Sequence, residues 1–518
     1  MDKISTSDVI YAAQLLKPKT SSGHDDIPAK IVISTIFSTA PILAHLINTS
    51  IDKCIFPKIL KIAKIRPIEK VKNNNDITNF RPISLLPSFS KIFEKFINDK
   101  LTSFLEKFKV ISASQYGFRK NHSTEIAVVE LIRKIGVAAE KKKFIAGIFL
   151  DLTKAFDCID HEILLSKLEH YGVRGKPHLL LKSYLSCRYQ YVIWNGKCSD
   201  MREREIEIGV PQGSILGPLL FILYINDLPC STAMFDYMMY ADDANLFKCN
   251  KSILKLIDET NDHIQHVIKW FANNKLTLNK NKTQLMIYGP VQYLNYKEPF
   301  KIMIDEHEVI ETKSLKFLGI IIDNKLSFKQ HINYVSNKIT NSLGAINKIK
   351  FFMTPYCLNI LYNSICLPHL VYGNIVWASA YPSTIKPLQV IMKRAMRIIT
   401  NSRSQVASKD LFLKTHNLDF HHLNEYLSTI FIFKHYLGKL PDIFKNYFYF
   451  NIKSRHANII RSNKSKSNIL HSHILCYGPR NWNKLISNYK LGDLLTCKTI
   501  FNFKKKLKSL LLNVMGKM

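Results

Sequence analysis

The sequence is short of negative charge. Its 518 residues contain 40 Asp and Glu side chains against 73 Lys and Arg, which gives a formal net charge of +33. A compact chain with such an excess repels itself unless it binds a polyanion. This imbalance makes nucleic acid the first candidate partner and an anionic membrane surface the second.

Long apolar runs are also scarce. The longest, Ile215 to Leu228, is interrupted by Gly217-Pro218 and by Asn226-Asp227. It falls short of the roughly 20 apolar residues that a bilayer requires. The first residues, Met1 to Ser5, lack the apolar core of a signal peptide. We expect an intracellular protein, nuclear or cytoplasmic, that is not secreted and has no membrane partner.

Clustered cysteines are missing too. The ten cysteines are scattered between Cys54 and Cys497, with no Cys-x-x-Cys pair and no Cys/His group at zinc spacing. Free thiols in a reducing compartment are the expected state. What remains is a chain with 47% hydrophobic and 11% aromatic residues, which is long enough for several packed subdomains.

In Tyr240-Ala241-Asp242-Asp243, two adjacent carboxylates stand between a mostly apolar run, Phe235–Tyr240, and a second short apolar segment, Ala244–Phe247. Runs of this length around a polar break predict a β-hairpin. Two adjacent carboxylates repel each other, although a turn needs only one Asp. A hard divalent cation such as Mg²⁺ explains the pair, because it binds carboxylate oxygens. For an isolated Asp-Asp, a solvated hairpin tip is the alternative.

A third carboxylate follows a continuous apolar run. Residues 144–150 are apolar and bounded by charged residues, which predicts a buried central strand with Asp151 at its end. A charge in that place is costly without a partner. If this strand lies beside the hairpin, Asp151, Asp242 and Asp243 could hold two metal ions about 3.5–4 Å apart, an arrangement that serves nucleotidyl transfer.

Other segments combine polar side chains with turn residues. Arg81 and Lys70 bracket a loop in an apolar region, and an Arg fork suits phosphate oxygens. Taken alone, each cation also fits a solvated surface. Pro211-Gln212-Gly213-Ser214 precedes an apolar helix. Leu315–Asp323 is predicted as a strand in which Gly319 marks a bulge or a close backbone approach.

Seven ordered blocks of the sequence resemble the reverse transcriptases of non-LTR retrotransposons, most closely the jockey-like LINE elements. They lie between roughly residues 20 and 325 and are Asn79–Leu86, Gln115–Arg119, Phe149–Asp157, Gly209–Pro218, Tyr240–Asp243, Leu278–Thr283 and Phe317–Gly319. The resemblance implies an α+β right-hand polymerase, with fingers, a palm with an antiparallel sheet, a helical thumb and a basic helical C-terminal region. The expected domains are an extension of the fingers (1–49), the reverse transcriptase domain (50–322), a thumb-like region (323–400) and the C-terminal region (401–518).

The resemblance also implies a set of metal ligands and a catalytic acid. Asp151, Asp242 and Asp243, with the backbone carbonyl of Leu152, would bind two Mg²⁺ ions, for which Mn²⁺ can substitute. Lys282 matches the family lysine that would protonate pyrophosphate, and the nearby Lys280 is a competitor for that role.

The nucleotide and the primer would be held by further residues. The nucleotide-binding set is Arg81, Lys70, Phe156, Gln212 and Gly213. Within it, Phe156 would be the steric gate that excludes a 2′-hydroxyl, and the alternative is a core aromatic. Gln212 and Gly213 would line the nascent base pair, and the alternative is a simple turn. Phe317, Leu318 and Gly319 would grip the primer end.

The implied activity is RNA-directed DNA synthesis by two-metal nucleotidyl transfer. The expected partners are an RNA template, a DNA primer and deoxynucleoside triphosphates, and basic helices after Phe328 would contact the hybrid. Because the chain starts almost directly at the fingers extension, endonuclease activity is expected from a missing upstream region or in trans. One alternative is a catalytically inactive nucleic-acid-binding relic of such an element. Another is an RNA-templated RNA polymerase, against which Phe156 argues.

Overall fold

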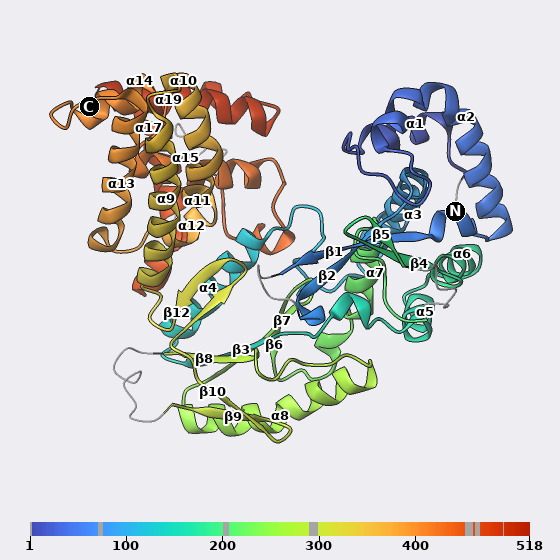
Figure 1. The fold of residues 1–518 in the computed structure, drawn as a ribbon. Helices are drawn as coiled ribbons and strands as arrows, with labels where there is room; N and C mark the ends of the chain where they lie inside the picture. Colours follow the sequence, from blue (N-terminus) through green and yellow to red (C-terminus); the bar gives the residue numbers. More distant parts are fainter. Residues whose placement is uncertain are drawn as a thin grey trace.

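The computed structural model describes residues 3–70, 76–199, 207–289, 299–450, 459–461, 467–489 and 492–517. Figure 1 shows three regions: a central sheet with α8 beneath it, a group of N-terminal helices in blue, and a lobe of C-terminal helices in yellow to red. Helices and mainly antiparallel sheets are mixed along the chain. The predicted α+β class is therefore confirmed.

A four-stranded antiparallel sheet in the order β6-β7-β3-β8 forms the centre. The strands are β3 (Phe144–Leu150), β6 (Asp236–Tyr240), β7 (Asp243–Asn250) and β8 (Gln284–Tyr288). Every residue of β3 is buried, because α4 (Thr124–Glu140) and α8 (Ile253–Asn273) both pack against it. Ile145 and Phe149 belong to one core cluster and Ala146 and Ile148 to another, so the two faces of β3 are covered separately.

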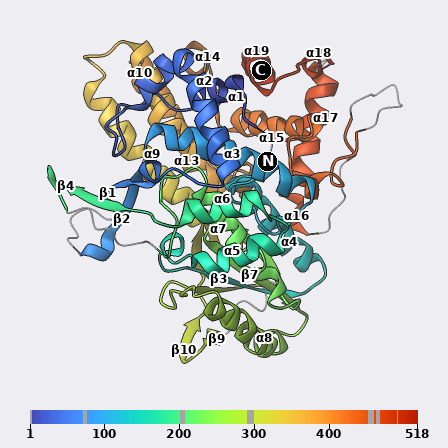
Figure 2. The same ribbon diagram turned by 90° about the vertical axis from the view of Figure 1, so that its right-hand side faces the viewer.

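The N-terminal part contributes a second sheet in the order β2-β1-β4-β5. β1 and β2 form an antiparallel hairpin, and β4 runs parallel to β1. Figure 2 shows β1, β2 and β4 projecting from the body of the molecule. The strands are β1 (Ala63–Glu69), β2 (Phe80–Leu85), β4 (Gln190–Trp194) and β5 (Lys197–Cys198). The helices of this part are α1 (Thr6–Gln14), α2 (Ala29–Lys53), α3 (Ser88–Lys107), α5 (His161–His170), α6 (Lys176–Leu185) and α7 (Gly217–Tyr224).

Helix α2 contains a longer apolar segment than the run Ile215–Leu228 that the sequence pattern singles out. By length and composition alone it could cross a membrane, and 28% of its apolar window is buried. One such helix is also common in packed globular folds, and α2 packs against α1, α3 and α6. The expectation that the chain has no membrane partner therefore stays a prediction.

The segment predicted as one strand over Leu315–Asp323 is instead a tight hairpin of β11 (Ser314–Phe317) and β12 (Ile320–Asp323). The chain reverses at Leu318-Gly319, where both residues have positive φ, 44° and 85°. A two-residue turn of this kind needs φ > 0 at both positions, which Gly supplies at little cost. Upstream, β9 (Lys301–Ile304) and β10 (His307–Ile310) form another hairpin.

The C-terminal lobe is helical. Its helices are α9 (Lys329–Ile349), α10 (Pro355–Leu361), α11 (Leu367–Val371), α12 (Asn374–Trp377), α13 (Pro382–Thr400), α14 (Ser408–Lys414), α15 (Phe420–Tyr436), α16 (Asn468–His471), α17 (Ile474–Tyr489), α18 (Gly492–Leu495) and α19 (Ile500–Lys517).

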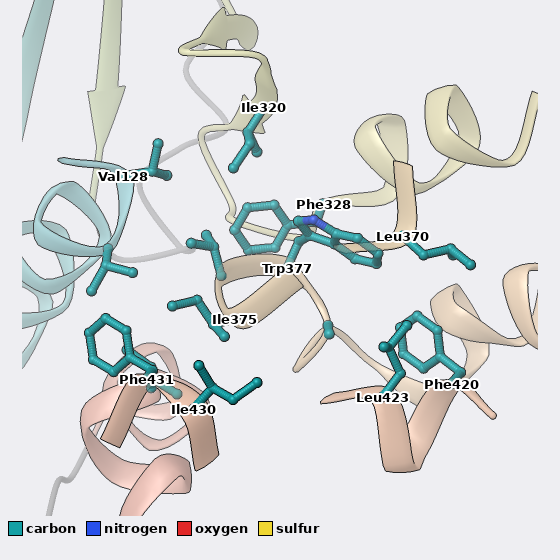
Figure 3. Close-up of a cluster of buried hydrophobic side chains, with 14 of the residues drawn as sticks. Val128, Ile320, Phe328, Leu370, Ile375, Trp377, Phe420, Leu423, Ile430 and Phe431 are labelled. Atoms are coloured by element: carbon teal, nitrogen blue, oxygen red, sulfur yellow. The ribbon is translucent and has the colours of Figure 1, made fainter. Parts of the chain in front are cut away.

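One continuous core joins this lobe to the central sheet. Figure 3 shows Trp377 beside Phe328, with Phe420 and Leu423 nearby, and Trp377 is fully buried. The same cluster contains Phe149 of β3 and residues on both sides of position 400. The predicted boundary between regions 323–400 and 401–518 therefore stays a prediction. All ten cysteines are free thiols, as expected.

Candidate active site

The register of the central sheet brings the three predicted carboxylates to one edge. Leu150 pairs with Ala244, so Asp151 follows β3 where Asp243 begins β7. Tyr240 pairs with Asp243, which leaves Ala241 and Asp242 as the two-residue turn of the hairpin. Residues that are about 90 positions apart in sequence are thereby neighbours, and the condition for a shared metal site, that the strand lies beside the hairpin, is met.

This edge opens into a cleft of about 1360 Å³ between the central sheet and the projecting β1–β2 hairpin. The cleft contains most of the predicted site residues. Its polar and aromatic lining includes Lys70, Phe80, Arg81, Asp151, Lys154, Phe156, Asp157, Trp194, Gln212, Asp242, Asn279 and Lys282.

The carboxylates destabilise one another's charge. Withdrawal from water, followed by repulsion from Asp242 and Asp151, raises the pKa of Asp243 to about 6. Withdrawal from water and the charge of Asp151 also raise the pKa of Asp242, and Arg81 acts in the opposite direction. Both residues are nevertheless exposed, and Asp242 lines the cleft. Like charges held this close favour a bound cation.

The donor atoms suit Mg²⁺. Among the residues that the structure describes, no three His, Cys, Asp or Glu side chains form a ready-made metal cage. Mg²⁺ does not require one, since it binds one or two carboxylates and completes its shell with water and substrate phosphate. Leu152 is bridged to Leu278 through the Asp151 carbonyl and the Thr153 amide. No bond of this bridge uses the Leu152 carbonyl.

A buried glutamine supports the carboxylate hairpin. Gln115 is fully buried, and its Oε1 accepts hydrogen bonds from the amides of Gly117 (2.7 Å) and Ala241 (3.2 Å). The latter matters because Ala241 has a positive φ of 54°, which is costly for a residue with a Cβ. The flanking residues Ser114 and Tyr116 exchange backbone hydrogen bonds with Met239 of β6. The sequence marked Gln115–Arg119 as a block but did not indicate this supporting role.

The floor of the cleft is formed by Phe156, Asp157 and the loop that contains Gln212. The half-buried Phe156 ring stacks on Phe221 of α7, with ring centroids 4.6 Å apart. The side-chain amide of Gln212 donates to Asp157 Oδ1 at 2.8 Å. Burial raises the pKa of Asp157, and this hydrogen bond acts in the opposite direction. Phe156 therefore packs as an aromatic and also faces the cleft.

Gly213 allows the Gln212 loop to approach β2. The Ser84 amide donates to the Gln212 carbonyl at 2.8 Å. Gly213 has a φ of 131°, and a Cβ on it would lie 2.5 Å from the Ser84 carbonyl oxygen. On the far side of the loop, the fully buried Glu94 accepts from the amides of Ile215 (2.6 Å) and Leu216 (3.3 Å). No pattern in the sequence indicates this role of Glu94.

The two candidate lysines occupy different places. Lys282 lies in the cleft, with its Nζ 3.7 Å from Asp151 Oδ2. Lys280 is paired with Asp305 at 2.8 Å. Geometry therefore places Lys282 beside the carboxylates, while its chemical role stays a prediction. Lys70 and Arg81 both line the cleft from the β1–β2 hairpin.

A second, smaller hollow of about 390 Å³ lies between the carboxylates and the β11–β12 hairpin. Phe317 and Leu318 line it together with Asp151 and Asp243. The turn is held from the C-terminal lobe, since the Tyr372 hydroxyl donates to the Leu318 carbonyl at 2.6 Å and lies 3.0 Å from the Thr124 hydroxyl. A Cβ on Gly319 would lie 3.0 Å from the Tyr372 ring. The sequence did not single out Tyr372.

Comparison with known proteins agrees with this geometry. Residues 69–322 match the family model described as "Reverse transcriptase (RNA-dependent DNA polymerase)". The probable RNA-directed DNA polymerase from transposon BS of Drosophila melanogaster is 30% identical over 435 residues, 80% of this chain and 47% of that protein. The RNA-directed DNA polymerase from mobile element jockey is 28% identical over 413 residues, and that of the X-element 28% over 411.

The last two proteins are also from Drosophila melanogaster, and each alignment covers 76% of this chain. The chain spans less than half the length of these relatives. Residues 69–322 thus belong to the reverse transcriptase family, and the chain resembles the polymerases of jockey-like non-LTR retrotransposons.

Proposed function

We propose that the chain is an RNA-directed DNA polymerase of a non-LTR retrotransposon, which extends a DNA primer on an RNA template. The observation that carries the proposal is the convergence of Asp151 with Asp242 and Asp243 at a cleft whose other wall carries Arg81. On this proposal the central sheet is the palm, the β1–β2 hairpin belongs to the fingers, and the C-terminal lobe supplies the thumb.

Asp151, Asp242, Asp243 and the Leu152 carbonyl would hold two Mg²⁺ ions, or Mn²⁺ in their place. When bound, such ions activate the primer hydroxyl and neutralise the charge that develops on the phosphates. The contribution of the chain is to keep three carboxylates together against their mutual repulsion. Gln115 serves this end because it fixes the backbone of the turn between β6 and β7.

The incoming nucleotide would lie between the fingers and the floor of the cleft. Arg81 and Lys70 would bind the triphosphate, because a guanidinium fork matches phosphate oxygens. Phe156 would lie against the sugar, where its ring leaves no room for a 2′-hydroxyl. Gln212 and Gly213 would line the base pair, and the bond from Gln212 to Asp157 orients that loop.

Lys282 would donate a proton to the leaving pyrophosphate. Its position 3.7 Å from Asp151 keeps an ammonium group beside the reaction site. The ion pair between Lys280 and Asp305 favours Lys282 over Lys280 for this role. A positioned acid of this kind typically contributes 10²–10⁴-fold to the rate.

The primer end would lie in the hollow beside Phe317, Leu318 and Gly319. Tyr372 fixes this hairpin from the thumb, so thumb and primer grip would move together. The implied partners are an RNA template, a DNA primer and deoxynucleoside triphosphates. A DNA endonuclease activity that makes the primer would act from another region or in trans.

The test is primer extension on an RNA template with Mg²⁺ or Mn²⁺. Deoxynucleotide incorporation is the expected result. RNA binding without any product would instead identify an inactive relic, and preference for ribonucleotides would identify an RNA polymerase.

A further inference from the structure

The turn between α9 and α10 exposes a group of aromatic side chains. Phe351, Phe352 and Tyr356 are 76%, 86% and 74% exposed, and residues 351 to 356 are all exposed. Such large apolar side chains are normally covered, and a contiguous exposed group of them marks an interaction surface. We call Phe351, Phe352, Met353 and Tyr356 the aromatic tip. None of these side chains lines the cleft or the hollow described above.

The stretch of sequence that contains the aromatic tip carries positive charge only. From residue 324 to residue 409 the sequence contains eleven Lys and Arg and no Asp or Glu. Lys348 is exposed in the last turn of α9, and Lys350 Nζ lies 4.8 Å from the centre of the Phe351 ring. α10 also packs against α13, on which Lys393 and Arg394 are exposed. A surface of flat rings among cations complements a polyanion that presents flat apolar faces.

The tip can be reached by a strand that occupies the cleft. α9 begins just after β12 and leads away from the central sheet to the tip, at the end of the C-terminal lobe near α10 (Figure 1). Its 21 residues span about 31 Å at ~1.5 Å per residue. That length corresponds to roughly nine nucleotide steps of ~3.4 Å. A nucleic-acid strand bound in the cleft would therefore extend to the tip, whereas nothing in the described part of this lobe brings a membrane there.

We propose that the aromatic tip binds unpaired nucleotides of single-stranded nucleic acid, with its rings stacked on bases and Lys348 and Lys350 on phosphates. Stacking on successive bases is sequence-tolerant, because every base has a π-face. The choice of nucleic acid as the occupant rests on the rings and cations of the tip and, for the strand that reaches it from the cleft, on the proposed function. Binding itself requires neither metal nor catalysis.

The test measures the affinity of the full chain for a labelled, unstructured 20-nucleotide RNA by fluorescence anisotropy in EDTA. The variant F351A/F352A should bind at least about tenfold more weakly. The matched control Y11A/F37A removes two other exposed aromatics, 61% and 68% exposed on α1 and α2, and should stay within about twofold. Unchanged affinity of F351A/F352A would overturn the proposal.

Two further sets of variants identify the kind of interaction. F351W/F352W should keep the affinity and F351L/F352L should lose it, because leucine is apolar but cannot stack. Retained RNA affinity in F351L/F352L would point to hydrophobic docking and overturn the assignment. Weakened binding of F351A/F352A to phosphatidylserine vesicles, with unchanged binding to RNA, would point to a membrane and overturn it as well.

K348A/K350A should make the negative slope of log affinity against log salt concentration less steep, by roughly 0.7 for each phosphate that these lysines neutralise. If the chain proves inactive as a polymerase but F351A/F352A still weakens RNA binding, the tip assignment stands and the proposed function falls.

Discussion

Gly117 lies directly against the backbone of Ala241. A methyl group on Gly117 would come within 2.3 Å of the Ala241 amide nitrogen and 3.1 Å of the Tyr240 carbonyl carbon. Real Cβ atoms do not approach backbone atoms so closely, so any side chain at position 117 must displace the carboxylate hairpin. The conformation of the hairpin turn thus depends on the absence of a side chain at position 117.

We expect Gly117→Ala to reduce nucleotide incorporation by at least about 10²-fold, because a displacement of about 1 Å in a reacting site costs this much. Primer-extension rates at saturating nucleotide check the prediction. Gly344→Ala in α9 is the matched control, since nothing lies within 4 Å of a Cβ there. The control should keep full activity and gain about 0.5–1 kcal/mol in free energy of unfolding, because Gly is unfavourable inside a helix. Equal activity of the two variants would contradict the role of Gly117.

Asp242→Asn should abolish incorporation and leave RNA binding nearly unchanged. The substitution keeps the shape of the turn residue but removes a charge from the metal-binding set. It also removes the Asp242 charge that, after burial, raises the pKa of Asp243, so the fold should be no less stable. Asp305→Asn, which removes the partner of Lys280 outside the cleft, should leave incorporation intact. Joint loss of RNA binding and folding in Asp242→Asn would mark the residue as structural.

Phe156→Val should increase the use of ribonucleotides relative to deoxynucleotides by about tenfold or more, since pocket discrimination by a steric group is of this size. The smaller side chain opens space in the cleft beside Gln212. It also loses the stack on Phe221, so the free energy of unfolding should fall by about 1–2 kcal/mol. Competition between labelled ribonucleotides and deoxynucleotides measures the ratio. An unchanged ratio would remove the gate assignment.

The sequence predicts the parts of the site that follow from local pattern. The apolar run 144–150 predicts both a buried strand and the carboxylate at its end. The break at Ala241-Asp242 predicts a hairpin. These signals work because a strand covered on both faces must be apolar along its length. The sequence predicts only conditionally that the strand and the hairpin lie side by side, because the order of strands in a sheet depends on contacts between distant segments.

The parts that the sequence did not predict depend on contacts between distant segments. Gln115 acts on a turn 126 positions away, and Tyr372 on a carbonyl 54 positions away. Nothing in the residue type reveals such a bond. The pattern over Leu315–Asp323 predicts one strand because a two-residue turn with a Leu at positive φ leaves the run of apolar residues almost uninterrupted.

Tyr372→Phe should weaken primer use without unfolding the chain. It removes the hydroxyl that holds the Leu318 carbonyl at 2.6 Å but keeps the ring against Gly319. A hydrogen bond of this kind contributes about 1 kcal/mol, so the KM for primer–template should rise about fivefold while the melting temperature changes little. Tyr362→Phe is the matched control, because its hydroxyl is buried without a hydrogen-bond partner in the described structure. Loss of that hydroxyl should be neutral or stabilising, with no effect on KM. A similar KM in both variants would rule out the coupling between thumb and primer grip.

His473 gives the C-terminal lobe a stability that depends on pH. Its buried ring donates from Nε2 to the Val129 carbonyl of α4 at 2.9 Å, and Nδ1 accepts from the Leu475 amide at 3.3 Å. The bond that Nδ1 accepts requires the neutral ring. Burial lowers the pKa of His473 from 6.5 to about 4, and the bond to Val129 acts in the opposite direction. Above pH 6.5 the ring is neutral in both the folded and the unfolded chain. Between pH 6.5 and 4 only the unfolded chain takes up the proton, so stability falls as pH falls.

The loss from this one group approaches about 3 kcal/mol at pH 4. His473→Gln keeps a donor but cannot be protonated, so its free energy of unfolding should vary less between about pH 7.5 and pH 5 than that of the natural chain. Urea titrations at the two pH values measure the difference. His331, whose pKa burial also lowers to about 4, is present in both proteins and cancels in the comparison. Identical pH dependence in the two proteins would show that His473 is already protonated in the folded chain or makes no contribution.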